Sequence, residues 1–185
     1  MWTKELFGTE KPIIALLHLD PLPGDPDFCG SLDTVIEHAS CDVKALQEGG
    51  VDGVLIANEF SFPMTYVSHT ETLMAMACVI GAIKKDIHVP FGTNVVMNPE
   101  ETIRMAKAVG ASFGRSAFAG AFTGTYGVHV NNFGENVRLK YALGIPEMKL
   151  LCKINPEGDV LLAEQSIEEI IDNVTLGDHV GAFCV

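Results

Sequence analysis

Six short apolar segments, separated by segments of helical pattern, decide what this chain can fold into. They begin near residues 12, 53, 90, 113, 149 and 181 and are mostly apolar. Strands without a polar face are buried on both sides, which is typical of a parallel sheet covered by helices. The order of the segments therefore predicts an α/β fold, either a doubly wound sheet or a (β/α)8 barrel.

Local signals place helices between these strands. Ser31 is a good N-cap for a helix that Gly49-Gly50 ends, and Asn98-Pro99 opens another helix because proline fits the first helical position. No Gly-x-Gly-x-x-Gly follows the first strand, which disfavours a dinucleotide site, and we favour the barrel. The glycine-rich stretch Gly120–Phe133 is predicted as a long loop.

The length of the chain bears on whether such a barrel closes. A (β/α)8 barrel takes roughly 250 residues, whereas this chain has 185. We expect residues 1–185 to form a single partial barrel domain of about six βα units, short at its C-terminal end. The open edges of such a sheet attract further strands, which predicts a homo-oligomer.

Charge and composition exclude several classes of protein. The chain has 12 Lys and Arg against 24 Asp and Glu, a net charge of −12, which opposes binding to nucleic acid. No apolar run approaches the roughly 18 residues of a transmembrane helix, and residues 1–10 lack the pattern of a signal peptide, so we expect a cytoplasmic protein. The five cysteines form no Cys-x-x-Cys pair, which indicates neither a disulfide framework nor a zinc site. We expect Cys78 and Cys152 to be small buried side chains.

Polar side chains stand where each apolar strand gives way to a loop, and in parallel α/β folds such positions carry the chemistry. Glu59 and His18 are the candidate catalytic acid/base groups. The candidate substrate-binding residues follow the first five strands: Asp20, Asn58, Asn94, Arg115 and Lys153. Together they predict a site for a polar small molecule.

Several of these residues have an alternative structural role. His18 is equally suited to a structural hydrogen bond at a strand end, and Arg115 either clamps an anion or pairs with a structural carboxylate such as Glu59. Lys153 points into the barrel or forms a salt bridge at its rim. No cofactor is expected: Asp20, His18 and Glu59 have donor atoms suited to a divalent metal, but no spacing motif supports one.

The other histidines, at positions 38, 69, 88, 129 and 179, have no ligand-like partner nearby in sequence. His129 and Asn131-Asn132 lie in the predicted long loop, and long loops inside compact domains are often functional. We expect these residues to be the most able of the remainder to reach a substrate.

A series of short motifs resembles the BtpA/SgcQ family, collinearly from about Trp2 to Val185. The motifs are His18-Leu-Asp-Pro-Leu-Pro-Gly24, Glu48-Gly-Gly-Val-Asp-Gly53, Asn58-Glu59-Phe60-Ser61, Pro90-Phe-Gly-Thr-Asn-Val95 and Asn155-Pro156-Glu157. Two of these motifs, Asn58-Glu59-Phe60-Ser61 and Asn155-Pro156-Glu157, make the SgcQ branch the nearer one. The resemblance implies a barrel of the ribulose-phosphate-binding type, with His18, Asn58, Glu59, Asn94 and Arg115 lining its site.

The chain departs from the family in three places. Thr125-Tyr126-Gly127 lacks the acid that commonly precedes this glycine, which counts against a catalytic role of the loop after the fourth strand. Gly114 stands where a bulky apolar residue is usual, which predicts a thinner barrel wall. Relatives continue through two more βα units, and in phosphate-binding barrels the loops after strands seven and eight form the anion site.

Two classes of function follow. The first is an enzyme acting on a small phosphorylated, sugar-like substrate, since the SgcQ branch is associated with sugar-phosphate metabolism; isomerase, epimerase, aldolase and lyase chemistry all stay open. The alternative is a non-catalytic assembly factor, as in the branch named for photosystem I biogenesis, or an inactive truncated barrel.

Overall fold

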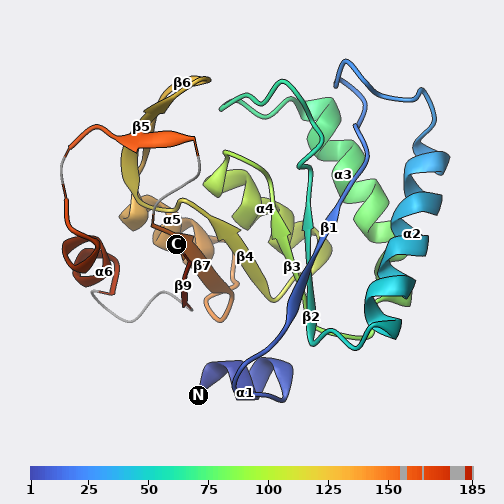
Figure 1. Cartoon of the computed structure of the whole chain (residues 1–185), viewed down its shortest axis with the longest axis horizontal. Coiled ribbons are helices and arrows are strands. Elements are labelled where there is room, and N and C mark those ends of the chain that lie inside the picture. The colour runs from blue at the N-terminus through green and yellow to red at the C-terminus, as the bar shows by residue number, and fades with distance from the viewer. Residues whose placement is uncertain (155–157, 164, 176–181, 185) are drawn as a thin grey trace.

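The apolar segments form one parallel sheet whose strands follow one another in sequence order (Figure 1). The computed structural model describes residues 1–154, 158–163, 165–175 and 182–184. The sheet consists of β1 (Ile14–His18), β2 (Gly53–Ala57), β3 (Phe91–Asn94), β4 (Phe113–Ser116), β7 (Lys149–Lys153) and β9 (Ala182–Cys184). A doubly wound sheet reverses its strand order at a switch point. This order never reverses, so the partial barrel is confirmed.

Helices follow the strands along the chain (Figure 1). They are α2 (Leu32–Glu48), α3 (Thr70–Ile83) with the short 3-10 helix η1 (Lys84–Asp86), α4 (Pro99–Val109), α5 (Phe133–Ala142) and α6 (Ile167–Thr175). The predicted caps form: the Ser31 hydroxyl accepts a hydrogen bond from the Thr34 N–H, and Asn98 Oδ1 accepts one from the Glu101 N–H. Among the described residues, no helix combines the length and the apolar character needed to cross a membrane.

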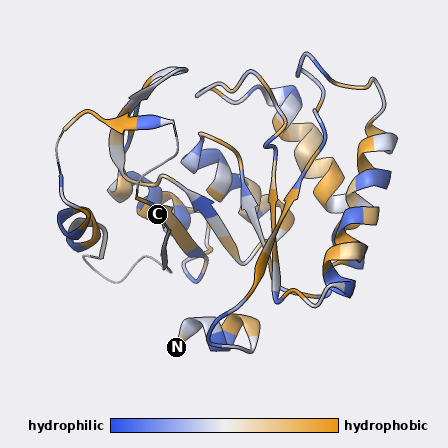
Figure 2. Cartoon of the chain, viewed as in Figure 1, coloured by the Kyte–Doolittle hydropathy of each residue, from blue (hydrophilic) through white to orange (hydrophobic). Residues whose placement is uncertain are grey.

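The core lies between the sheet and the helices α2, α3, α4 and α5. β1, β2 and α3 are largely hydrophobic along their length (Figure 2), and every residue of β2 is buried. A second cluster joins α4 and α5 to β7 and to Phe118 just after β4, and contains Cys152, which is buried as expected. Cys78 is exposed instead, because its position on α3 faces away from the sheet.

The short helix α1 (Trp2–Phe7) lies at the amino-terminal end of the strands (Figure 1). Its Phe7 ring packs edge-on against Phe113, with 5.5 Å between ring centroids. A Cβ on Gly53 would lie 2.7 Å from the same Phe7 ring, so glycine is required for this approach. The Phe7 side chain thus covers the end of the barrel opposite to the loops that follow the strands.

The expected thin wall at Gly114 is not found. A Cβ at Gly114 would lie 2.7 Å from Met148 Cε and 2.8 Å from Thr102 Cγ2. Both neighbours are buried, so their side chains occupy the volume that a larger residue would take. The glycine is therefore part of a filled wall.

The predicted loop Gly120–Phe133 is the largest error in the sequence-based fold. Its residues form an antiparallel hairpin of β5 (Gly120–Gly124) and β6 (Gly127–Asn131), and β8 (Asp159–Leu161) pairs with the other side of β5. Phe122 is buried and pairs with His129, whereas Val128 and Val130 face solvent. This alternation is that of a strand with one face covered, but three glycines in the stretch obscured it.

Candidate active site

A pocket of about 210 Å³ opens at the carboxyl ends of the parallel strands. Four of the predicted residues line it: Glu59 after β2, Asn94 at the end of β3, Arg115 in β4 and Lys153 at the end of β7. Tyr126, His129 and Asp159 line it from the antiparallel sheet. The pocket therefore lies between two sheets, the barrel strands and the hairpin with β8.

The two cations that line the pocket are Arg115 and Lys153. Within the described ranges, neither Arg115 nor Lys153 forms a salt bridge, and Arg115 Nε is buried without a hydrogen-bond partner. Arg115 and Glu59 therefore do not form the ion pair that was the alternative role of Arg115. A buried guanidinium N–H without an acceptor is costly, and a bound anion would satisfy it.

Asn58 is not one of the residues that line this pocket. Its side chain is buried, and Oδ1 accepts a hydrogen bond of 2.8 Å from the Val96 N–H. It lines a second cavity, of about 200 Å³, on the other side of Met64 and Val96. Asn58 therefore ties the end of β2 to the segment after β3, and these two segments respectively carry Glu59 and follow Asn94.

His18 and Asp20 are placed outside the residues that line the pocket. The His18 ring packs edge-on against Phe60, with 5.6 Å between centroids, and its Nε2 is buried without a partner among the described residues. Asp20 Oδ2 lies 2.6 Å from Nδ1 of His38 on α2. A catalytic role for His18 and a binding role for Asp20 stay predictions.

The metal alternative depended on Asp20, His18 and Glu59 together. In the part of the chain that the structure describes, no three His, Cys, Asp or Glu side chains are grouped so that they could hold a metal ion. Asp20 contacts His38 on α2, whereas Glu59 lines the pocket. Within the described residues, Asp20, His18 and Glu59 therefore do not form a metal-binding group.

His129 lies between two aromatic rings in the wall of the pocket. Its ring centroid is 4.3 Å from that of Tyr66 and 5.1 Å from that of Phe122. The side chain is 9% exposed, and Nε2 lies 4.0 Å from Oδ2 of Asp159, which is 7% exposed. Burial lowers the pKa of His129, an effect that the Asp159 charge only partly opposes, so the imidazole is neutral at pH 7.

Two further groups complete this part of the site. Burial raises the pKa of Tyr66, with smaller contributions from the Asp159 charge and from Tyr126, so its phenol keeps its proton. The Tyr66 hydroxyl and His129 Nδ1 are buried and have no partner in the described ranges. A Cβ at Gly124 would overlap the Asp159 carboxylate, so that glycine makes room for the acid.

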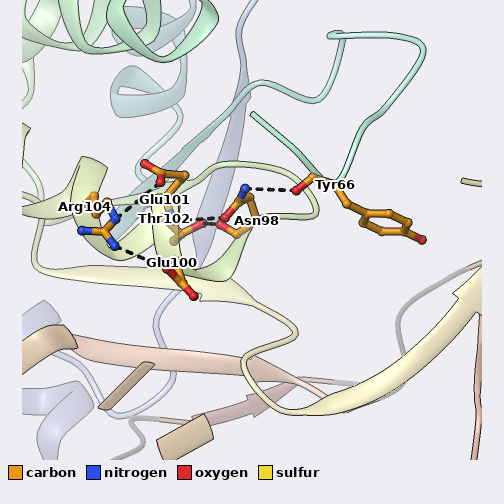
Figure 3. A network of polar contacts seen from close by, with 6 residues as sticks. All are labelled: Tyr66, Asn98, Glu100, Glu101, Thr102 and Arg104. Carbon is orange, nitrogen blue, oxygen red and sulfur yellow. Dashed lines mark hydrogen bonds and ion pairs between the residues drawn. The ribbon is translucent and has the colours of Figure 1, made fainter. Parts of the chain in front are cut away.

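The segment that carries Tyr66 is fastened to the start of α4 (Figure 3). Asn98 Nδ2 donates a hydrogen bond of 3.2 Å to the Tyr66 carbonyl oxygen, while the Thr102 hydroxyl donates one of 2.9 Å to the Asn98 carbonyl oxygen. Arg104 bridges the carboxylates of Glu100 and Glu101 in the same turn. The Tyr66 side chain points away from this network. The hydrogen bond from Asn98 therefore holds the backbone of Tyr66, whose side chain packs on His129.

The remaining expectations divide between structural and pocket roles. His129 reaches the pocket, but Asn131 Nδ2 donates to the Ala117 carbonyl oxygen and Asn132 caps α5. Asn155-Pro156-Glu157 and His179 lie outside the described residues. Sequence reasoning missed Tyr66, Tyr126 and Asp159. The alternation around Phe122 could have revealed the hairpin with Tyr126, whereas no local pattern marks Tyr66 or Asp159.

Comparison with known proteins decides the family. The model of the BtpA family matches residues 9–185. The chain belongs to the BtpA family. It is 43% identical to the sgc region protein SgcQ of Escherichia coli K12, across 100% of this chain and 69% of SgcQ. It is 32% identical to the photosystem I biogenesis protein BtpA of Synechocystis, across 75% of this chain and 50% of that protein.

Solved structures with this fold are TIM-barrel enzymes. A 7,8-dihydropteroate synthase from Vibrio fischeri matches with a TM-score of 0.59 at 16% identity, over 92% of this chain and 59% of its own length. A dihydrodipicolinate synthase from Agrobacterium tumefaciens matches with a TM-score of 0.59 at 16% identity, over 94% and 53%. The chain thus spans little more than half of these barrels, and the likeness concerns the fold alone.

Proposed function

We propose that this BtpA-family chain belongs to an enzyme that binds a small phosphorylated, sugar-like substrate and transfers a proton on it. The observation that carries the proposal is that Arg115 and Lys153 line the pocket together with Glu59 and, within the described residues, form no salt bridge. Charge-assisted hydrogen bonds from such groups suit phosphate and carboxylate oxygens. The volume of about 210 Å³ is below the range of about 300–1,000 Å³ that drug-sized ligands occupy, which favours a small metabolite.

Glu59 is the proposed base. A carboxylate that removes a C–H proton beside a carbonyl group leaves the electron pair on the carbonyl oxygen as an enolate. Arg115 or Lys153 would stabilise that negative charge, and the Asn94 amide would hydrogen-bond the substrate. Isomerisation, epimerisation and aldol or lyase chemistry all begin with this step, and acid/base groups of this kind contribute about 10²–10⁴-fold.

The proposal is tested with a panel of sugar phosphates that includes ribose 5-phosphate. We expect calorimetry to detect binding, and Arg115→Ala to weaken it at least tenfold, a loss of about 1.4 kcal/mol, because the anion loses its guanidinium partner. Glu59→Gln leaves the affinity within about threefold, or 0.7 kcal/mol, and abolishes the exchange of carbon-bound hydrogen with D2O, measured by NMR.

Arg104→Ala is the matched control for Arg115, since Arg104 pairs with Glu100 and Glu101 on α4 outside the pocket. It should leave both affinity and exchange unchanged. If no panel member binds, and Arg115→Ala and Glu59→Gln are silent, the enzyme proposal is wrong and the assembly-factor alternative is favoured.

A further inference from the structure

The pocket contains a second candidate for proton transfer, on a different sheet from Glu59. Glu59 follows strand β2 of the barrel, whereas His129 belongs to β6 of the hairpin and Asp159 to β8. Both strands pair with β5, so the hydrogen bonds of the antiparallel sheet bring His129 and Asp159 together. Neither residue is close to Glu59 in sequence.

The surroundings of His129 fix its orientation. Tyr66 and Phe122 pack on its ring at 4.3 Å and 5.1 Å between centroids, which limits rotation of the side chain. Nε2 faces the Asp159 carboxylate at 4.0 Å, and Nδ1 is buried without a partner among the described residues. A histidine that packs only as a core residue would have both ring nitrogens satisfied. Here one nitrogen faces an acid, and the other has no acceptor or donor in the part of the chain that the structure describes.

We infer that His129, oriented by Asp159, is a second proton-transfer group of the pocket, and that the substrate is an α-hydroxycarbonyl sugar phosphate. The inference rests on the proposed function and deepens it. A nearby carboxylate favours the tautomer with the proton on Nε2, because that N–H points at a negative charge. Nδ1 then keeps its lone pair for a substrate hydroxyl.

The proton transfers balance as follows. Glu59 takes the C–H proton, and the C–H electron pair forms an enediolate whose charge rests on the former carbonyl oxygen. His129 Nδ1 takes the proton of the neighbouring hydroxyl and delivers it to that oxygen, while the Asp159 carboxylate stabilises the transient imidazolium. The other carbon then recovers a proton from Glu59. The carbonyl group has moved by one carbon, and both side chains have returned to their starting states.

The charged and titratable groups around His129 agree with this role. Asp159 from β8 and Tyr66 from the segment before α3 face its ring, and Tyr126 lies next to Tyr66. Burial keeps the pKa of His129 below its ordinary value, so Nδ1 is available as a base at neutral pH.

The decisive measurement needs no substrate. Nitrogen-15 NMR of His129 at pH 7.5 should show a protonated Nε2 and an unprotonated Nδ1. Asp159→Ala should give a mixture of tautomers, with Asp159→Asn as a second variant that keeps the volume. His38→Asn, which removes the exposed histidine beside Asp20, should leave the His129 spectrum unchanged. A protonated Nδ1 in the wild-type protein, or a tautomer that ignores both Asp159 variants, overturns the inference.

A second readout separates His129 from Glu59. With ribose 5-phosphate in D2O, His129→Asn should keep affinity and C–H exchange within threefold but slow the interconversion of aldose and ketose at least a hundredfold. Glu59→Gln should abolish both exchange and interconversion. Equal loss of exchange in the two variants contradicts the division of roles. Failure of the proposed function is read separately, from the absence of an effect of Arg115→Ala on phosphate-ester affinity.

Discussion

Gly92 in strand β3 shows how a single residue shapes the wall of the barrel below the pocket. A Cβ on Gly92 would overlap the ring of Phe113, which is fully buried. The same ring contacts Phe7 of α1. Because Gly92 has no side chain, the Phe113 ring of β4 can pack against β3 and also contact α1 at the opposite end of the barrel.

Gly92→Ala should lower the free energy of unfolding by about 1–3 kcal/mol, because overpacking a dense core forces a buried ring to shift. Urea denaturation followed by circular dichroism measures the change. Gly81→Ala is the control: the Cβ there would meet no atom within 4 Å, and the residue lies inside α3. Alanine should stabilise that helix by up to about 1 kcal/mol. Equal stability of Gly92→Ala and the wild-type protein would contradict this view of the wall.

Among the elements, the three-stranded sheet β6-β5-β8 has the greatest effect on the site. It supplies Tyr126, His129 and Asp159 to a pocket whose other polar groups come from the barrel strands. The segment between β2 and α3 contributes Tyr66 and is held by Asn98 at the start of α4 (Figure 3). Elements outside the barrel strands therefore fix one complete side of the site.

The cap of α4 gives a test of this attachment. Asn98→Ala removes both the cap and the bond to Tyr66, and should cost about 1–2 kcal/mol of unfolding free energy. Asn98→Asp keeps an acceptor for the Glu101 N–H but has no donor for the Tyr66 carbonyl oxygen. It should stay within about 0.5 kcal/mol of the wild-type protein, yet raise amide hydrogen exchange around residue 66. Ser31→Ala, at the cap of α2, should lower stability without this local change; protection around residue 66 that persists in both Asn98 variants would refute the attachment.

At the scale of the whole molecule, the parallel sheet has two edges. β1 pairs with β2 on one side, and no described residue pairs with its other side. Leu16 in this strand and Ile13 just before it are 43% and 64% exposed. An exposed apolar edge strand is a template for pairing with another chain.

We therefore expect this chain to self-associate, as sedimentation velocity over a wide concentration range would show. Leu16→Lys should shift the distribution toward the monomer, since a charge on an edge strand opposes pairing. Met74→Lys places the same charge on an exposed position of α3 and should have no effect. A wild-type chain that stays monomeric at every concentration would disprove the expectation.

The fold was more predictable from the sequence than the site. The strands, the caps at Ser31 and Asn98 and the barrel order depend on local spacing and on burial of apolar segments, which a sequence displays directly. The hairpin was missed because Gly120, Gly124 and Gly127 are typical of loops, although Gly120 and Gly127 adopt positive φ angles at the ends of strands. Here the pairing of β5 with two strands outweighs the local preference.

The sequence by itself determined the parallel α/β barrel and the positions of Glu59, Asn94, Arg115 and Lys153 at one edge of it, because parallel strands place their carboxyl ends together. Only the tertiary structure decided which polar residues share a pocket. Asp20 turns to His38 and Asn58 to the Val96 N–H, whereas Tyr66 and Asp159 join His129. These outcomes depend on contacts between segments distant in sequence, which periodicity and capping signals do not encode.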